Sequence, residues 1–475
     1  MEILNEKGAI GFNTTYDPIL DLFASVGGLA PQSEVSEKLK DTLRLAVTFN
    51  PVESAIVLFN LRDRLEGMGY RNIFRTLFKS TLGYCNDYKK LIPLIPEYGR
   101  WDDLSALIGV NKEIDELIID IVKKQLAEDL ISEAPSLLAK WMPSINTSSS
   151  EAKKLGKFFA KNLGLSEKNY RQTLTRLRSK IKIIENNLRT KDYSFDYSHV
   201  PSLAMSKYKN AFERNDSERY SDYLNNVKTG KAKINTSTLN IVDMAKSVRK
   251  GGRDLVNIQY DNLPDFGECN ALVCMDGSGS MYRSRNGVEC IDVAKALTVY
   301  CSDRNKTYKN QFITFGSYVN FVTLKGKTFS EKIEELDQYD DCGTTNFEKV
   351  FLEILSHAKM YHLTPEQMID TLIVVSDMQF DDPCCFKNKN KSVYRKLQDM
   401  FKEEGFEMPK LVFWNVSTAR ALPITVDDFN ATILSGWSQN MVRYILSGED
   451  ITPRMVLEEV TKSPRYAKIA EVLNV

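Results

Sequence analysis

One acid and two hydroxyl groups follow an apolar segment in the second half of the chain. Asp276, Ser278 and Ser280 alternate with glycines directly after the strand-like run from Ala271 to Met275. The glycines let the backbone turn tightly enough for alternate side chains to converge on one point. Carboxylate and hydroxyl oxygens are the ligands that hard divalent cations prefer. The segment therefore predicts part of a metal site, although on its own it could also be an ordinary turn.

Two later segments could complete the same site. Gly343-Thr344-Thr345-Asn346 supplies a hydroxyl group, and Asp377 ends the apolar run that begins at Thr371. The carboxyl ends of strands in an open α/β sheet are where ligands collect, so these side chains are expected to meet. Two carboxylates and three hydroxyls favour Mg²⁺, or another divalent cation, with one open position for an oxygen of a partner. These segments contain no histidine that could activate a water, so the site is expected to dock a partner and the protein to have no enzymatic activity.

The three segments together resemble the metal-ion-dependent adhesion site of the von Willebrand factor A domain. That family combines Asp-x-Ser-x-Ser with a distant Thr and a distant Asp, in this order. The resemblance implies Asp276, Ser278, Ser280, Thr345 and Asp377 as metal ligands and a protein partner that offers an acidic residue. Thr345 is preferred over Thr344 because Thr345-Asn346 aligns with the end of the family's Gly-Gly-Thr-Asp string. The second glycine of that string is Thr344 here, so the choice between the two threonines stays open.

The elements that position this site have the pattern of a doubly wound α/β domain over residues 266–475. Short apolar runs alternate with amphipathic helical segments, which is typical of a mostly parallel sheet covered on both faces. The expected strands are Ala271 to Met275, Gln311 to Phe315, Val319 to Leu324, Thr371 to Val375, Leu411 to Val416 and Ala431 to Leu434. The expected helices are Val288 to Cys301, Phe329 to Leu336, Asn346 to Met360 and Lys391 to Glu404. The stretch from Gly251 to Glu268 is expected to be a hinge.

Residues 1–260 are expected to form an all-α domain. Apolar residues three and four apart alternate with turn residues such as Pro51, Gly67 and Gly69. The clearest segments are Ser36 to Phe49, Val52 to Leu65, Tyr70 to Leu82 and Lys112 to Leu130. Short helices joined by short turns suit a stacked helical array. No fixed-period repeat is visible, so a regular solenoid and an irregular array remain equal alternatives.

The charge of the chain is unevenly distributed. The 475 residues include 63 basic and 63 acidic ones, and 43% are apolar, which excludes a disordered chain or a uniformly basic coat. Residues 140–260, however, hold 24 basic and 11 acidic residues, a net charge of +13 that the rest of the chain cancels. Helical spacing places several of these cations on common faces, where phosphate backbones would be attracted, or where acidic partners elsewhere could neutralise them. The candidate nucleic-acid-binding residues, interleaved with Phe158, Phe159 and Tyr170, are Lys154, Lys157, Lys161, Arg171, Arg176, Arg178 and Lys182.

The helical half has a resemblance of its own. Gly99-Arg100-Trp101-Asp102-Asp103-Leu104 resembles a string in the TROVE module of the Ro ribonucleoprotein family, a ring of HEAT-like helices closed by a von Willebrand A domain. Segments near Trp141, Pro201 and Lys231 are similar to an uncharacterised family of Ro-like proteins. The resemblance implies binding of small non-coding or misfolded RNA. In this string Trp101 could equally be a core anchor, and Arg100 could pair with Asp102 or Asp103.

The remaining features concern the compartment and the competing function. The eight cysteines are scattered without C-x-x-C pairs, the N-terminus shows no secretory signal, and no run of about 18 apolar residues occurs. We therefore expect a cytoplasmic protein that does not associate with membranes. The alternative to RNA binding is a metal-dependent protein–protein interaction scaffold whose basic helices are only solvated.

Overall fold

Helices are the main elements of the described chain between residues 18 and 261, after a short antiparallel pair of strands that the sequence did not indicate. The computed structural model describes residues 2–4, 10–12, 16–27, 29, 33–181, 183–236, 239–249, 251–263, 270–282, 284–285, 288–315, 319–339, 347–376, 390–416, 431–435 and 453–474. The two strands are β1 (Glu2–Leu4) and β2 (Ile10–Phe12). The first helices are α1 (Pro18–Gly27), α2 (Glu37–Phe49), α3 (Pro51–Arg62), α4 (Arg71–Thr81), η1 (Asn86–Leu94), α5 (Ile95–Tyr98) and α6 (Trp101–Ser105).

The next helices carry the basic part of the chain. They are α7 (Lys112–Ile131), α8 (Leu138–Trp141), α9 (Ser150–Asn162), α10 (Glu167–Lys180), α11 (Ile184–Thr190), η2 (Tyr197–His199), α12 (Ser202–Asn215), α13 (Ser217–Lys228), α14 (Ile241–Arg249) and α15 (Arg253–Asp261). Local capping explains several starts: the side chains of Asn50, Ser149 and Ser166 accept hydrogen bonds from the first turns of α3, α9 and α10. Helix α15 lies within the stretch expected to be a hinge, so that expectation is wrong for residues 253–261.

A six-stranded sheet lies at the centre of the second half of the described chain. Its strands are β3 (Ala271–Asp276), β6 (Gln311–Phe315), β7 (Asn320–Thr323), β8 (Thr371–Ser376), β9 (Lys410–Asn415) and β10 (Ala431–Ser435), in the order β10-β9-β8-β3-β6-β7. All neighbours are parallel except β6 and β7. In chain order this is the 3-2-1-4-5-6 arrangement of doubly wound sheets, whose direction of winding reverses between β3 and β8.

Helices cover both faces of this sheet, as the apolar runs predicted. Side chains at alternate positions of β3 separate into two buried clusters: Ala271, Val273 and Met275 pack with α16 (Cys290–Arg304), whereas Leu272 and Cys274 pack with α18 (Phe347–Met360). Helix α17 (Phe329–Leu336) joins the first cluster and α19 (Asn390–Glu403) the second. The short segments η3 (Gly279–Tyr282), β4 (Ser284–Arg285), β5 (Val288–Glu289) and η4 (Pro365–Gln367) connect these elements. The expectation of a helical array followed by a doubly wound α/β domain is confirmed.

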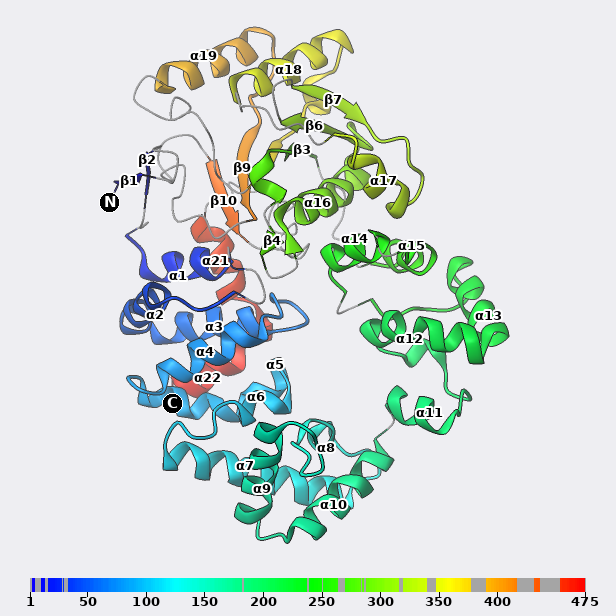
Figure 1. Ribbon diagram of the computed structural model, residues 1–475. Helices are drawn as coiled ribbons and strands as arrows, with labels where there is room; N and C mark the ends of the chain where they lie inside the picture. The colour runs from blue at the N-terminus through cyan, green and yellow to red at the C-terminus, as the bar shows by residue number, and fades with distance from the viewer. Residues whose placement is uncertain are drawn as a thin grey trace.

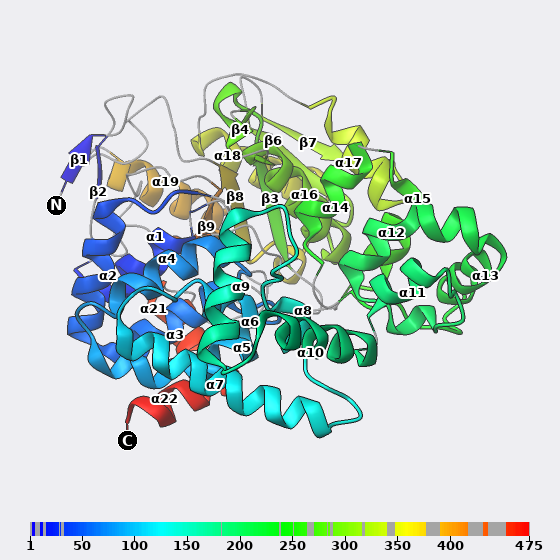
Figure 2. The same cartoon turned by 60° about the horizontal axis from the view of Figure 1, so that its bottom comes forward.

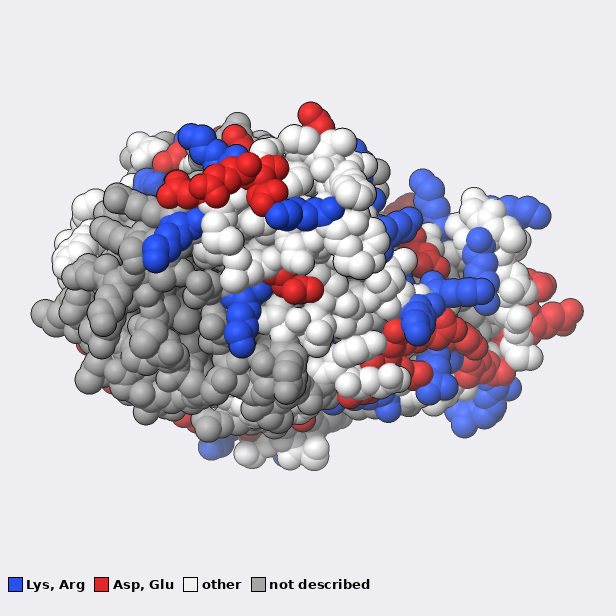
Figure 3. Space-filling view, turned by 90° about the horizontal axis from the view of Figure 1, so that it is seen from above, with Lys and Arg blue, Asp and Glu red and all other residues white. Residues whose placement is uncertain are grey.

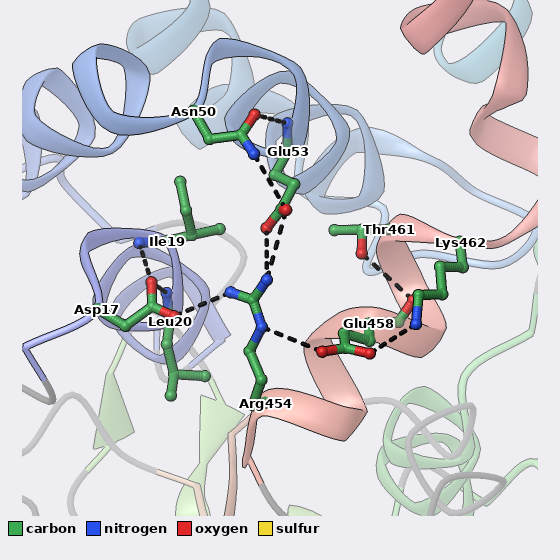
Figure 4. A network of polar contacts seen from close by, with 9 residues as sticks. All are labelled: Asp17, Ile19, Leu20, Asn50, Glu53, Arg454, Glu458, Thr461 and Lys462. Carbon is green, nitrogen blue, oxygen red and sulfur yellow. Dashed lines mark hydrogen bonds and ion pairs between the residues drawn. The ribbon is translucent and has the colours of Figure 1, made fainter.

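The end of the chain returns to the helical half. After β10, helix α21 (Pro453–Thr461) packs on α1 and α3, and η7 (Pro464–Tyr466) leads into α22 (Ala467–Leu473), which packs on η1 and α3. Arg454 of α21 lies between three carboxylates, 2.9 Å from Asp17, 3.3 Å from Glu53 and 3.3 Å from Glu458 (Figure 4). We call residues 453–474 the C-terminal arm. It ties the α/β domain to the first helices through opposite charges.

The helical array begins and ends at the α/β domain. Helix α1 contacts β10, and α14 contacts α16, while the helices between them pass along one side, across the bottom and up the other side (Figure 1). Figure 2 shows the same path with α8, α9 and α10 brought forward. The elements therefore form a closed ring. No helix among the described residues is long and apolar enough to cross a membrane.

Candidate metal and nucleic-acid sites

Asp276 ends the central strand β3 at the point where the winding of the sheet reverses. Its neighbours β6 and β8 run parallel to β3, and Met275 pairs with Val375, so Asp276 and Ser376 emerge from adjacent strands at the same edge. Asp276 is 3% exposed. Burial, and then the charge of Asp276, raise the pKa of the nearby Cys274 thiol. The carboxylate thus lies in a poorly hydrated position at the edge where such sheets bind ligands.

The Asp276 carboxylate accepts hydrogen bonds from one backbone N–H and one hydroxyl group. The backbone N–H of Ser278 donates to Asp276 Oδ1 at 2.9 Å, and the Ser278 and Ser280 hydroxyl oxygens are 3.0 Å apart. The Ser376 hydroxyl donates to Asp276 Oδ2. Ser376 was not among the predicted ligands. Its position at the end of the β8 run, one residue before Asp377, could have indicated that it lies beside Asp276. The donor set is made of oxygens alone, which fits Mg²⁺.

The two remaining predicted ligands, Thr345 and Asp377, lie outside the described residues. Asp377 directly follows Ser376, the residue that bonds to Asp276. Within the described part of the chain, no three or more His, Cys, Asp or Glu side chains are grouped to hold a metal. The structure thus brings Asp276, Ser278 and Ser280 together, and the full ligand set stays a prediction.

Helix α9 presents three of the predicted cations on its solvent side. Lys154, Lys157 and Lys161 are exposed, whereas Gly156 and Phe159 are buried against the core. Lys157 forms an ion pair with Glu167 at 3.0 Å, at a surface where both side chains are half exposed. Such pairs contribute little to stability and leave the lysine able to exchange partners. Lys154 and Lys161 have no carboxylate within ion-pair distance among the described residues.

The predicted cations of helix α10 differ in their exposure to solvent. Arg171 and Arg176 are exposed. Arg178 instead donates to the carbonyl oxygens of Ala139 and Met142, at 2.7 and 2.8 Å, and to the Ser144 hydroxyl at 3.0 Å. Burial lowers the pKa of its guanidinium. Arg178 therefore fastens α10 to the end of α8, which corrects its assignment as an RNA-binding residue; Lys182 lies outside the described residues.

The aromatic residues interleaved with these cations belong mainly to the core. Phe159 and Tyr170 are buried, the Tyr170 hydroxyl donates to the carbonyl of Pro143 at 2.8 Å, and Phe158 is half-buried beside Phe159. Bases stack on exposed aromatic faces. Because these rings are covered, the surface of α9 and α10 offers positive charge without a stacking platform. Seen from the end that carries α18 and α19, by contrast, described cations and anions are interspersed (Figure 3).

The Gly-Arg-Trp-Asp-Asp string forms a buried ionic network. Asp103, at the start of α6, accepts from Arg62 Nε at 2.9 Å and from Arg75 Nε at 2.6 Å. Its carboxylate also accepts from the backbone N–H of Arg100 at 2.9 Å. Arg100 pairs with Asp102 at 3.2 Å, as one of the sequence alternatives expected. A Cβ at Gly99 would lie 2.4 Å from Asp103 Oδ2, so only glycine lets the backbone pass this close to the carboxylate.

Comparisons with known proteins give similarity over most of the chain. Two regions match families that are described only as domains of unknown function, DUF2828 over residues 115–268 and DUF7788 over residues 270–471. The uncharacterized protein L728 of Acanthamoeba polyphaga mimivirus is 27% identical over 504 residues, which cover 96% of this chain and 86% of that protein. Among solved structures, the Ro (RSR) protein of Deinococcus radiodurans aligns with a TM-score of 0.49 at 12% identity, covering 94% of this chain and 99% of that chain.

Proposed function

We propose that this chain is an RNA-binding protein that holds structured or misfolded small RNA on its basic helices. The observation that carries the proposal is the surface of α9 and α10, where Lys154, Lys161, Arg171 and Arg176 are exposed and face no described carboxylate within ion-pair distance. Positive charge without acidic partners attracts phosphate backbones through counterion release. The closed helical ring and the string from Gly99 to Leu104, which resembles the Ro family, support the same proposal.

Reversing three of these charges is expected to weaken RNA binding. We expect the Lys154→Glu, Lys161→Glu, Arg176→Glu variant to bind a hairpin RNA with a single-stranded end at least tenfold more weakly than the native protein at about 0.1 M salt. All three side chains lie at the surface, so the fold should be retained. Filter binding across a salt series measures the affinity and its salt dependence.

A matched variant separates local charge from net charge. The control variant carries three substitutions of exposed cations on α2 and α7: Lys38→Glu, Arg44→Glu and Lys112→Glu. It changes the net charge by as much as the α9 and α10 variant does, and it should retain most of the affinity for RNA. RNA binding that is absent at low salt, or that does not change with salt, would contradict the proposal. It would favour the scaffold function, in which the basic helices are only solvated.

The α/β domain is proposed to dock a protein partner through a divalent cation. Asp276, Ser278 and Ser280 would hold the ion together with Thr345 and Asp377, and the ion would supply an open position for an acidic side chain of the partner. The buried carboxylate and its adjacent hydroxyl groups at the edge of the sheet support this proposal. The resemblance of these segments to the metal site of the von Willebrand A domain implies that each of the five residues is a metal ligand.

Removing Asp276 is expected to abolish the metal site. Calorimetric titration of the native protein with Mg²⁺ should show one site, whose affinity falls about tenfold or more in Asp276→Ala because a charged ligand is lost. Asp377→Ala should have a similar effect. Asp370→Ala, at the opposite end of β8, is the matched control and should titrate like the native protein. Equal Mg²⁺ affinity in Asp276→Ala and the native protein would refute the ligand set.

A further inference from the structure

The sheet of the α/β domain has two edge strands, and they differ in their surroundings. Strand β10 contacts α1 of the helical half and α21 of the C-terminal arm. Strand β7 ends the sheet on the other side, and among the described strands it pairs with β6 alone (Figure 1). The unpaired edge of a strand is a template on which another chain can pair. The outer edge of β7 is therefore a candidate binding surface.

The backbone groups on this outer edge belong to Phe321 and Thr323. At the end of the antiparallel pair, the N–H of Leu324 donates to the carbonyl of Asn310 on the β6 side at 2.8 Å. Successive residues of such a ladder direct their N–H and C=O groups to opposite sides of the strand. Phe321 and Thr323 lie an odd number of positions before Leu324, so their groups point away from β6. No other described element hydrogen-bonds to these groups.

Strand β7 lacks the features that normally protect an edge. Its four residues, Asn320–Thr323, include no proline and no charged side chain, and both end residues are exposed. Proteins usually block open edges with lysine, proline or a covering segment. The open stretch ends at Lys325, whose N–H donates to the Glu335 carboxylate at 2.8 Å. Within the described chain, the edge from Asn320 to Thr323 is thus able to accept an extended backbone.

A row of rings leads from this edge to the end of α18. The Phe321 ring stacks on the His357 ring with 4.1 Å between their centres, and the His357 ring lies 4.4 Å from that of Tyr361. Phe321 and His357 are half-buried, whereas Tyr361 is 60% exposed and Met360 beside it is 74% exposed. Side chains that lie opposite each other on neighbouring strands pack together. An apolar or aromatic residue on an added strand would therefore pack against this row.

Three exposed lysines lie at one end of the same edge. The register of β6 and β7 places Lys309 opposite Lys325, and Lys327 follows. Among the described residues, no carboxylate lies within ion-pair distance of these three side chains. This end is far from the candidate metal site, because Asp276 pairs with Phe315 at the other end of β6. An acidic residue of a partner would be attracted to the lysines.

We propose that the outer edge of β7 binds an extended peptide of another protein, which joins the sheet as an antiparallel strand. The peptide carries an apolar or aromatic side chain opposite Phe321 and an acidic residue near its amino end, beside Lys325. Main-chain hydrogen bonds supply the affinity in this mode of binding, and the side chains supply the specificity. The site uses neither RNA nor the cation, so it goes beyond the proposed function.

A second copy of this chain is a poorer occupant of the edge. Strand β7 has only four residues, and such a contact is much smaller than the roughly 1,000 Å² that a specific interface between two folded copies buries. Residues 319–323 also contain no acidic side chain that could pair with the lysines of the other copy. A short acidic peptide meets both conditions.

The test takes its probes from a phage-displayed library of random decapeptides selected on the full chain. Synthetic copies of the enriched peptides are titrated by fluorescence anisotropy. Thr323→Pro removes one outward N–H and leaves the pairing with β6 intact, because proline is tolerated where the N–H of an edge strand faces solvent. Thr323→Val keeps that N–H and is the matched control.

Two further variants change exposed side chains, so the fold should be retained, which thermal unfolding checks. Tyr361→Ala removes the exposed ring, and Lys325→Glu reverses a charge at the end of the edge. Lys79→Glu on α4 reverses an equally exposed charge away from this edge and is the control for net charge.

We expect the enriched peptides to carry apolar residues at alternate positions and to bind Thr323→Pro about tenfold more weakly. Tyr361→Ala and Lys325→Glu should each weaken binding severalfold, and both controls should bind like the native protein. The proposal is overturned if none of the enriched peptides loses affinity in these three variants, or if the library yields no binder. Loss of binding in EDTA or in Asp276→Ala would place the peptide at the metal site and overturn this one. A native dimer in analytical ultracentrifugation that Thr323→Pro dissociates would identify a second copy as the occupant and contradict the peptide.

Discussion

Asp103→Ala should lower the free energy of unfolding by about 3–5 kcal/mol, because it leaves buried guanidinium groups without their counterion. Arg62 is 1% exposed, and its side chain has no other described carboxylate within ion-pair distance. Desolvation already lowers the pKa of Arg62, and attraction to Asp103 is the largest effect that opposes the lowering. Without Asp103, the charge must stay buried unpaired or draw the end of α3 towards water. Urea unfolding followed by circular dichroism measures the loss.

Two variants show whether this loss comes from the buried charge. Glu37→Ala removes a carboxylate that is 84% exposed and pairs with Lys40, so it should change stability by less than about 0.5 kcal/mol. The double variant Arg62→Met, Asp103→Ala should lose less stability than the sum of the two single losses. The reason is that it also removes the buried Arg62 charge that Asp103→Ala leaves without a partner. Strict additivity of the two single changes would show that the pair is not coupled.

The α/β half could be predicted closely because both faces of its sheet are covered. Buried strands such as Ala271–Asp276 and Thr371–Ser376 need apolar side chains along their middle, which makes them visible as continuous runs between amphipathic helices. Carboxyl ends of parallel strands meet at one edge, so Asp276 could be placed at the candidate site as well. Ser376 was overlooked as its hydrogen-bond partner because strand order, which the sequence does not contain, determines which residues become neighbours.

The expectations for Arg178 and for the hinge were wrong although the sequence contained the spacing of buried residues that argues against them. Arg178 was aligned with Arg171, seven residues away, yet it is also four residues after the buried Leu174 and one after the buried Leu177. That spacing places Arg178 on the buried side of α10, where its guanidinium reaches the C-terminal end of α8. Leu255, Val256 and Ile258 likewise mark a buried helix face inside the expected hinge, between the flanking glycines and Pro264.

The return of the C-terminal arm could not be read from the sequence. Residues 453–474 show amphipathic helices, and such a pattern reveals which face is buried but not which element covers it. The partner is fixed by contacts between residues about four hundred positions apart, as in the ion pair of Arg465 with Asp63. Opposite charges on two surface segments are common, so their presence alone does not predict that they meet.

Arg465→Ala is expected to release the C-terminal arm from the first helices. Arg465 donates to both oxygens of Asp63, at 3.0 and 3.1 Å, and its guanidinium lies 4.6 Å from the centre of the Tyr98 ring. The Asp63 side chain is 1% exposed, so removing Arg465 leaves a buried carboxylate supported only by hydrogen bonds such as the one from the Tyr466 hydroxyl at 3.2 Å. We expect a loss of about 3 kcal/mol in the stability of this contact. Hydrogen exchange of α22 should become at least tenfold faster.

Lys468→Ala provides the matched control on the same arm. Lys468 is 59% exposed and pairs with Glu97 at 3.0 Å, so its removal should leave the exchange of α22 nearly unchanged. Salt should separate the two pairs as well, because ions screen exposed charges far more than buried ones. If Arg465→Ala and Lys468→Ala had equal effects, the arm would be held by apolar packing of Tyr466 and Ile469 rather than by the buried ion pair. A faster exchange in Arg465→Ala that extends to α1 and α14 would show that the arm also keeps the helical ring closed against the α/β domain.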